Sequence, residues 1–444
     1  MKKSIIILTV LFISTATFAQ HESHQMQQDT TDHEGIGHTM DGMMSHSFSR
    51  NLPMNRNGSG TGWLPDNSPM YGYMLHTDKW MYMFHGNIFL RYNNQDIGKK
   101  GSRGDSKFDA PNWFMGMGQR KIGNRGLLRF SAMLSLDPLT VGGEGYPLLF
   151  QSGETWQGEP LVDRQHPHDL FSELSVGYTH MFSENADAFV YLGYPGEPAF
   201  GPVAFMHRLS SLYNPDAPIG HHWQDATHIT FGVATAGFRY RNFKIEASSF
   251  TGREPNEERY GFDKPRFDSW SARLSYNPSP AWALQVSQAR VNDVHEFGPR
   301  EDVNKTTASA IHSLRLNPKF FLNSAAVWGY NDAVGGHHRP SHSFLLESAL
   351  TLNTTTVYGK YEWVEKSAED LLLDEAVYGH GKLFPINSIT LGIQQRLINL
   401  LKTNAAIGVQ GSLYHTSNQL NGLYGKNPMA LEVYLRIYPG LMGM

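Results

Sequence analysis

Several features are missing from this 444-residue sequence, and each absence narrows the fold and the function. There is no cysteine, which excludes disulfide bonds, thiolate metal sites and a cysteine-linked lipid anchor. Beyond the first 19 residues there is no apolar run of the roughly 20 residues that a membrane-spanning helix needs. The formal net charge is only -4, so the chain has no broad basic field and nucleic acid is not an expected partner.

Motifs of catalysis are missing as well. There is no Gly-x-Ser-x-Gly nucleophile elbow, and no pair of carboxylates stands out as a glycosidase pair. The glycine run at 58–62 lacks the lysine of a phosphate-binding loop. The sequence therefore predicts that the protein is not an enzyme and uses no catalytic cofactor.

The first 19 residues have the pattern of a secretory signal peptide. Lys2 and Lys3 give a basic start, an apolar stretch follows over 5–13, and Ala19 ends a plausible cleavage site. The apolar stretch is too short to span a membrane. We expect an exported protein whose mature chain begins near residue 20.

Residues 20–50 are rich in histidine and methionine and poor in β-branched and aromatic residues, which predicts a disordered tail. Thioether sulfur selects Cu(I), and imidazole also takes Cu(II), zinc or nickel, so we expect this tail to capture copper or another transition metal. The alternative is a polar tail of biased composition. The candidate ligands are His21, His24, Met26, His33, His38, Met40, Met43, Met44 and His46. Residues 51–78 are expected to be a linker or a segment inside a lumen.

Most of the remaining chain alternates between apolar and polar residues, which is the pattern of β-strands. The hairpin 268–291 is the clearest case, with Trp270, Leu274 and Tyr276 on one face and serines with Arg273 on the other. One lipid-facing and one water-facing side per strand is typical of a membrane barrel. About sixteen such segments are predicted, at 79–92, 112–120, 126–137, 170–182, 186–194, 226–239, 241–251, 268–277, 281–291, 304–317, 319–331, 341–352, 354–366, 386–398, 401–414 and 428–438.

The connections alternate in length. Those after even-numbered segments are short, whereas those after odd-numbered segments are long, reaching about thirty residues at 138–169 and 195–225. A soluble β-sandwich also has alternating strands, but it has no reason to sort its loops in this way. The sequence therefore predicts an all-β transmembrane antiparallel barrel at 79–438. It would lie in the outer membrane of a Gram-negative cell, with long extracellular loops, short periplasmic turns, both termini in the periplasm and a short C-terminal tail at 439–444.

A barrel of about sixteen strands leaves an aqueous lumen unless something fills it. The predicted inward faces carry nearly balanced charges, so the wall favours neither cations nor anions. These residues are Arg129, Lys244, Arg273, Arg315, Lys360, Arg396 and Arg436 against Glu173, Asp187, Glu246, Glu347, Glu362 and Glu432.

The two longest loops contain histidines beside carboxylates and are rich in proline, glycine and aromatic residues. We expect them to be ordered and packed over or into the lumen. Their candidate metal ligands are His166, His168, His221, His222 and His228. The alternative is a scaffold in which these histidines form hydrogen bonds within folded loops.

Three runs in these loops, at 163–170 (DRQHPHDL), 196–202 (GEPAFGP) and 217–231 (APIGHHWQDATHITF), resemble a group of uncharacterised bacterial outer-membrane proteins. This resemblance implies a barrel but no activity. In its layout of leader, Met/His-rich amino-terminal region and barrel, the chain is also similar to copper resistance protein B. The loops are longer here, and the last strand is followed by PGLMGM in place of a terminal aromatic residue.

We therefore expect an outer-membrane barrel that binds or exports a heavy metal, most plainly copper. Its partners would be membrane lipid, metal ions or small solutes, and a periplasmic efflux or metal-carrier protein. The alternative is a general or substrate-selective porin without a metal role. A third hypothesis is a barrel enzyme that uses loop histidines.

Overall fold

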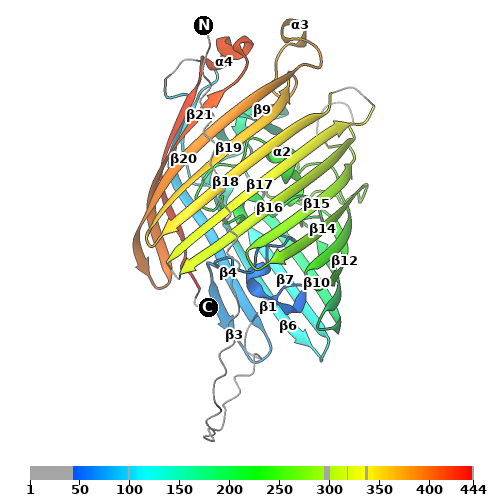
Figure 1. Cartoon of the computed structure of the whole chain (residues 1–444). Coiled ribbons are helices and arrows are strands. Elements are labelled where there is room, and N and C mark those ends of the chain that lie inside the picture. The colour runs from blue at the N-terminus through cyan, green and yellow to red at the C-terminus, as the bar shows by residue number, and fades with distance from the viewer. Residues whose placement is uncertain (1–43, 99–100, 295–300, 318, 336–338, 443–444) are drawn as a thin grey trace, which may run out of the picture. The chain divides into compact units, whose positions relative to one another are not determined.

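The computed structural model describes residues 44–98, 101–294, 301–317, 319–335 and 339–442. Sixteen antiparallel strands close into one barrel, in which each strand pairs with the next and the last, β22, pairs with the first, β4 (Figure 1). The predicted fold class and strand number are confirmed. The barrel strands are β4 (Met81–Gln95), β6 (Asn112–Ile122), β7 (Gly126–Leu134), β10 (Phe171–Ser183), β11 (Ala186–Gly193), β12 (Val233–Tyr240), β13 (Phe243–Phe250), β14 (Ser269–Ser279), β15 (Trp282–Val291), β16 (Val303–Asn317), β17 (Phe320–Ala333), β18 (Ser341–Leu352), β19 (Thr355–Ser367), β20 (Leu383–Leu400), β21 (Thr403–His415) and β22 (Met429–Pro439).

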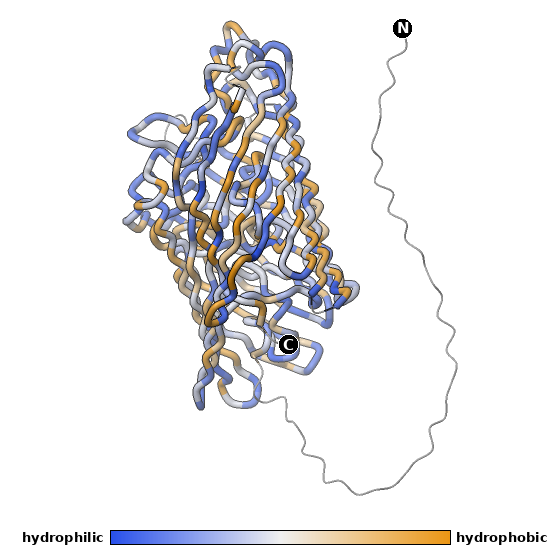
Figure 2. The backbone as a smooth tube through the Cα atoms, turned by 90° about the vertical axis from the view of Figure 1, so that its left-hand side faces the viewer, coloured by the Kyte–Doolittle hydropathy of each residue, from blue (hydrophilic) through white to orange (hydrophobic). Residues whose placement is uncertain are grey.

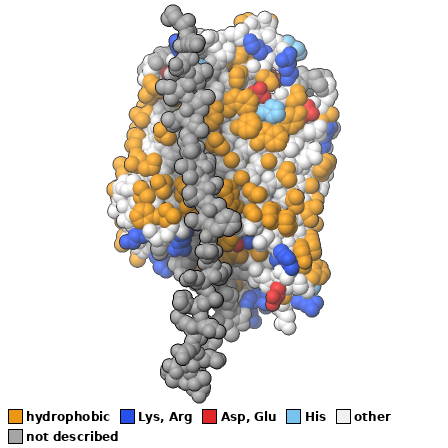
Figure 3. Space-filling view, viewed as in Figure 1, with side chains coloured by type: hydrophobic (Ala, Val, Ile, Leu, Met, Phe, Trp, Pro, Cys, Tyr) orange, Lys and Arg blue, Asp and Glu red, His pale blue; other side chains and the backbone are white. Residues whose placement is uncertain are grey.

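The barrel strands direct their apolar side chains to the outer face of the wall and their polar side chains to the lumen. On β22, Leu431 and Val433 are 42% and 44% exposed, whereas Glu432 and Arg436 between and beyond them are 1% exposed. The hydropathy of the backbone alternates along the strands in Figure 2, and apolar side chains cover much of the outer face in Figure 3. This inverted arrangement is the one that a barrel surrounded by lipid requires.

Connections of very different length meet the two rims of the barrel. The short-turn rim has connections of two or three residues, such as 123–125, 184–185 and 353–354. The long-loop rim carries connections such as 135–170 and 194–232. In outer-membrane barrels the short turns lie on the periplasmic side. The predicted alternation of loop length is thus observed along the whole barrel.

Three segments fill the lumen. They are the N-terminal segment (44–72), the first plug loop (135–170) and the second plug loop (194–232), and most of their residues are buried. Their regular elements are β1 (Ser45–His46), β2 (Ser49–Pro53) and η2 (Met54–Arg56), then α1 (Asp137–Thr140), β8 (Tyr146–Trp156) and β9 (Glu159–Gln165), and finally η3 (Phe205–His207), α2 (His221–Gln224) and η4 (Ala226–His228). The two plug loops are ordered and lie inside the barrel.

The remaining elements lie at the rims. The short strands β3 (Tyr73–His76) and β5 (Ser106–Asp109) pair with the two ends of β4. The elements α3 (Glu375–Tyr378), η5 (Asn418–Leu420) and α4 (Asn421–Tyr424) belong to long loops (Figure 1). Among the described residues no helix is both long and apolar enough to cross a membrane.

The structure corrects the predicted boundaries of two segments. Residues 44–50, expected in the disordered tail, are folded in the lumen because Phe48 is an apolar anchor: its ring lies 4.8 Å from that of Phe189 and 4.9 Å from the guanidinium of Arg129. The strand expected at 226–239 begins only at Val233, because the preceding residues form η4 inside the lumen. Of the two alternatives for 51–78, residues 51–72 take the lumen position.

Candidate functional site

The predicted inward charges are mostly buried and paired along the wall. Glu246 accepts from both Lys244 (2.8 Å) and Arg273 (2.9 Å), and Arg239 donates to Asp187 at 2.5 Å. Because buried charges require partners, this pairing explains why the two signs nearly balance in the sequence.

The second plug loop is fixed to the wall by Arg208, whose side chain is fully buried. Its Nε donates to Glu347 on β18 at 2.7 Å, and its Nη1 donates to Asp225 of the same loop at 3.2 Å. Lys360 on β19 adds a bond to the carbonyl oxygen of Ala217 at 3.2 Å. The loop is therefore held at several places by strands that lie far away in the sequence.

Arg91 on β4 connects both plug loops to the wall. Its guanidinium donates to Asp109 at 2.6 Å, to Asp216 of the second plug loop at 2.7 Å and to Glu432 on β22 at 3.0 Å. The same group lies 4.0 Å from the ring centre of Tyr146 in the first plug loop. One buried cation thus ties together two strands and both loops.

The fold brings together all five candidate ligands of the plug loops. The ring of His221 lies 4.9 Å from those of His222 and His228 and 6.2 Å from that of His166, between ring centres. The rings of His166 and His222 are 5.7 Å apart, and those of His168 and His228 are 5.8 Å apart. The expected convergence of two loops on one cluster is therefore observed.

Each ring of this histidine cluster has an oxygen partner. The partners are Glu154 for His166 (3.2 Å), Asp137 for His168 (2.9 Å), Asp225 for His221 (2.5 Å), Glu254 for His222 (3.5 Å) and the carbonyl oxygen of Asp225 for His228 (2.8 Å). Such partners orient rings behind metal ions, and they also hold plain hydrogen-bonded scaffolds together. In the part of the chain that the structure describes, no three or more His, Cys, Asp or Glu side chains are arranged to hold a metal ion. As it stands, the geometry is that of the scaffold alternative.

Burial controls the charge of this cluster. It lowers the pKa of His228 to about 3 and the pKa of His166 well below its usual value, with nearby His222 and Arg259 adding to the latter effect. Burial alone would raise the pKa of Asp225, but the adjacent His221 and Arg208 outweigh it and lower that pKa to about 2. His166 and His228 are therefore expected to be neutral at pH 7, and Asp225 to be ionised.

The tail candidates are divided by the start of the described chain. His21, His24, Met26, His33, His38, Met40 and Met43 lie outside the described residues. Met44 and His46 are buried in the lumen. Nδ1 of His46 accepts from the backbone N–H of Phe48 at 3.0 Å, so this ring is a packed part of the fold.

Sequence reasoning missed a group of methionines on the inner wall. They surround a cavity of about 90 Å³, which we call the methionine cavity. It is lined, among others, by Met54, Met70, Met83, Met115, Met117, Met206, His85 and His207. A signal was present: Met81 and Met83, like Met115 and Met117, are two residues apart on strands and therefore share a face.

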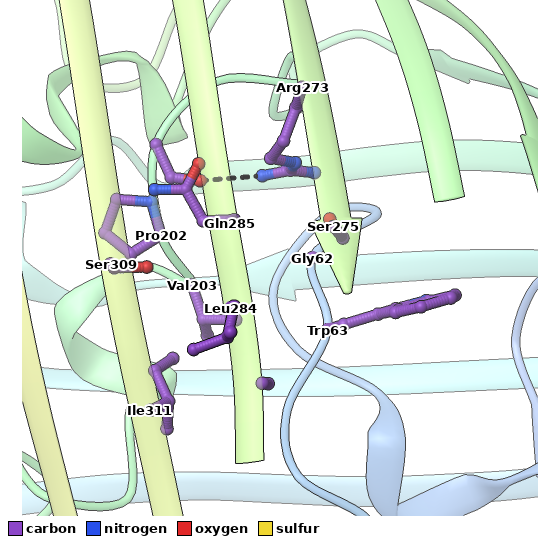
Figure 4. Close-up of a pocket in the computed structure, with 12 residues that line it drawn as sticks. Gly62, Trp63, Pro202, Val203, Arg273, Ser275, Leu284, Gln285, Ser309 and Ile311 are labelled. Carbon is purple, nitrogen blue, oxygen red and sulfur yellow. Dashed lines mark hydrogen bonds between the residues drawn. The ribbon is translucent and has the colours of Figure 1, made fainter. Parts of the chain in front are cut away.

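Other cavities in the lumen are small or lie near the short-turn rim. A cavity of about 10 Å³ lies between Trp63 of the N-terminal segment and the wall, where Arg273 donates to the carbonyl oxygen of Gly201 at 3.0 Å (Figure 4). Another, of about 150 Å³, is lined by Arg396 and Lys319 among others. At roughly 30 Å³ per water molecule in the liquid, the larger of these two cavities has room for about five waters and the smaller for at most one.

Comparison with known proteins identifies the fold. No protein-family model and no curated protein matches the chain. Similar solved structures include an anion-selective porin from Comamonas acidovorans, with 12% identity and a TM-score of 0.51 over 81% of this chain and 99% of that one. The complex of Salmonella typhi OmpF with daunomycin is similar at 10% identity and a TM-score of 0.50, over 82% and 100%. The chain has the fold of the outer-membrane porins.

At 12% and 10% identity this likeness shows the fold, and that fold is consistent with the predicted outer-membrane location. It fits the predicted barrel group, and it fits the porin alternative better than the copper hypothesis. No link to copper resistance protein B is shown, so that resemblance stays a prediction.

Proposed function

We propose that the protein is a substrate-selective porin of low conductance, rather than a general diffusion channel. The observation that carries this proposal is the docking of two long loops inside a barrel of the porin fold. The second plug loop is held by buried ion pairs at Arg91 and Arg208, and removing one partner of such a pair costs about 3–5 kcal/mol. Tyr146 of the first plug loop packs against the same Arg91. While the loops stay docked, the space that remains in the lumen admits only small solutes.

The size of the remaining spaces supports this selectivity. Cavities of about 90 and 150 Å³ have room for an ion with a few waters but not for a sugar in its hydration shell. The paired wall charges leave no ring of one sign to select anions or cations. Selection would therefore act on size and on the chemistry of individual side chains. That the chain is not an enzyme stays a prediction.

Single-channel recording in planar bilayers tests this function. We expect small, steady currents in potassium chloride, and liposome-swelling assays should show that sugars are excluded. The matched comparison is a general diffusion porin reconstituted in the same lipid. Equal conductance in both proteins, or free passage of sugars, would contradict a selective role. A complete lack of current would contradict the proposal that the protein is a channel.

Binding of a transition metal is a second candidate function, supported by the convergence of five histidines. Their carboxylate partners resemble the second shell of metal sites. A small rotation of His221 and His228, whose rings are 4.9 Å apart, would direct both toward one ion. We expect H221Q/H228Q to bind one zinc or Cu(II) ion fewer per chain in calorimetry, whereas H380Q, which changes an exposed loop histidine, should bind as many as the wild type. Equal binding by both variants would leave the histidines as a scaffold.

The proposed metal capture by the tail needs a different comparison. Residues 44–50 pack in the lumen, so the informative truncated chain begins at Met44, the first residue that the structure describes. If the tail gathers copper, this chain should bind fewer copper ions than the mature protein. Equal uptake would remove the tail from the metal hypothesis, and with it the expected handover from a periplasmic efflux or metal-carrier protein.

A further inference from the structure

The methionine cavity has a composition that filling a space does not require. The sequence has 18 methionines, and 11 of them belong to the apolar cluster around this cavity. They are Met44, Met54, Met70, Met74, Met81, Met83, Met115, Met117, Met133, Met206 and Met442. Among the described residues no leucine, isoleucine or valine belongs to this cluster, although these are the usual residues of packed cores, and three leucines, Leu64, Leu209 and Leu212, line the cavity beside the methionines. Flexible thioethers are a poor choice for packing alone, but they are soft metal ligands.

The methionines come from separate parts of the chain and converge by register. Met83 on β4 pairs directly with Met117 on β6, and His85 pairs with Met115 on the same two strands. Met54 reaches the cavity from the N-terminal segment. Four separate parts of the chain, including the second plug loop with Met206, thus contribute methionines to the lining of one space of about 90 Å³.

Two imidazoles complete the lining. The rings of His85 and His207 are 5.6 Å apart, and the indole of Trp113 lies 5.2 Å from the first and 4.6 Å from the second. Nε2 of His85 is buried and has no hydrogen-bond partner among the described residues. A buried polar atom without a partner destabilises the folded state, and a bound ion would supply the missing partner.

The charges around the cavity select the kind of ion. No aspartate or glutamate lines it among the described residues, so calcium and magnesium lack the carboxylate ligands that they usually need. Arg436 also lines it, where its guanidinium donates to Asn87 at 2.8 Å and stacks 3.9 Å from the ring centre of Tyr438. A fixed positive charge repels a divalent cation more than a monovalent one.

We propose that the methionine cavity binds a soft monovalent metal ion, Cu(I), through methionine sulfur atoms and Nε2 of His85. Thioether ligands without carboxylates suit Cu(I) and its redox-inert analogue Ag(I). The site is separate from the histidine cluster, although His207 also lines a small cavity that contains His228. The proposal does not depend on conduction by the barrel.

The test measures the unfolding temperature of the full mature protein in detergent, read from its heat-dependent mobility on gels. The protein is heated with Ag(I), or with Cu(I) kept reduced under anaerobic conditions. An ion that binds only the folded site raises this temperature, whereas an ion held by the tail does not. The test variant is M83L/M115L/M117L, because leucine conserves volume at these wall positions. The control is M181L/M429L, which changes the two described methionines outside the cluster.

We expect Ag(I) and Cu(I) to raise the unfolding temperature of the wild type and the control, and to have little effect on the triple variant. The triple variant should also bind one silver ion fewer per chain in equilibrium dialysis. If the triple variant does not fold, H85F and M206L give the same measurement. The H221Q/H228Q variant should keep the full response, which separates this site from the histidine cluster. An equal response in the triple variant, or an equal response of the H221Q/H228Q variant to Zn(II), would overturn the proposal.

Discussion

Removal of the Arg208 side chain should open the lumen. In R208M, methionine keeps most of the apolar stem but removes the guanidinium that joins the second plug loop to Glu347 on β18. The barrel strands themselves are untouched, because Arg208 belongs to the loop. The expected result is therefore a channel whose wall folds normally and whose loop leaves the lumen more often.

The magnitude follows from the contacts of Arg208. The side chain is fully buried, its bonds to Glu347 and Asp225 are 2.7 and 3.2 Å long, and it also donates to the carbonyl oxygen of Val203 at 3.0 Å. Removing one partner of a buried ion pair costs about 3–5 kcal/mol. At about 1.4 kcal/mol per factor of ten, the ratio of displaced to docked loop should rise by roughly 100-fold or more.

Single-channel recording provides the assay, with open probability as the quantity compared. R266M is the matched control, since Arg266 pairs with Asp293 at 2.6 Å on an outer loop but is 38% exposed, and such pairs contribute at most about 1 kcal/mol. Heat-dependent gel mobility should show that both variants contain folded barrels. If folded R208M has the open probability of R266M, the ion pair does not hold the loop and the reasoning is wrong.

Three further predictions concern the wall and the lumen. G408V should lower the unfolding temperature by several degrees, because Gly408 pairs directly with Tyr434 on β22 and an added side chain would collide with that ring; G411V, where the space is open, is the control. Burial raises the pKa of Glu197 to about 8, so the fold favours the protonated carboxyl. The resulting contribution to the free energy of unfolding is complete below about pH 4, falls as the pH rises and is lost above about 8. E197Q should remove this pH-dependent loss of stability. Urea unfolding in micelles at pH 5 and pH 9 should show a smaller difference in E197Q than in the wild type, and an unchanged difference would contradict the assigned pKa. V433R, on the lipid face near the middle of β22, should cost about 2–4 kcal/mol in refolding into lipid bilayers, and no cost would contradict a membrane-facing wall.

The sequence alone determined the barrel. Strand alternation is a local property, since each residue faces lipid or lumen according to its parity, and both environments leave their mark on the residue type. Leu431 and Glu432 are adjacent in the chain and differ fully in exposure, as their types predict. The alternation of loop length and the inward position of Glu246 and Arg273 follow from the same rule.

Only the tertiary structure decided how the lumen is filled and which groups meet there. Arg208 and Glu347 are 139 residues apart, and nothing in either local sequence indicates that they pair. The plug-loop histidines stand out because they are close together in the sequence, but their arrangement also depends on a carboxylate from outside the two loops, Glu254, which lies 3.5 Å from His222.

The methionine cavity shows most clearly what the sequence alone does not determine. Its residues lie on two strands, a loop and an N-terminal segment, and each methionine alone looks like an ordinary apolar residue. Strand register brings Met83 opposite Met117, and loop docking adds Met206, so the cavity exists only when all these segments are in place. Local patterning fixes which face a side chain takes, whereas long-range packing fixes its neighbours, and the chemistry of a site depends on the neighbours.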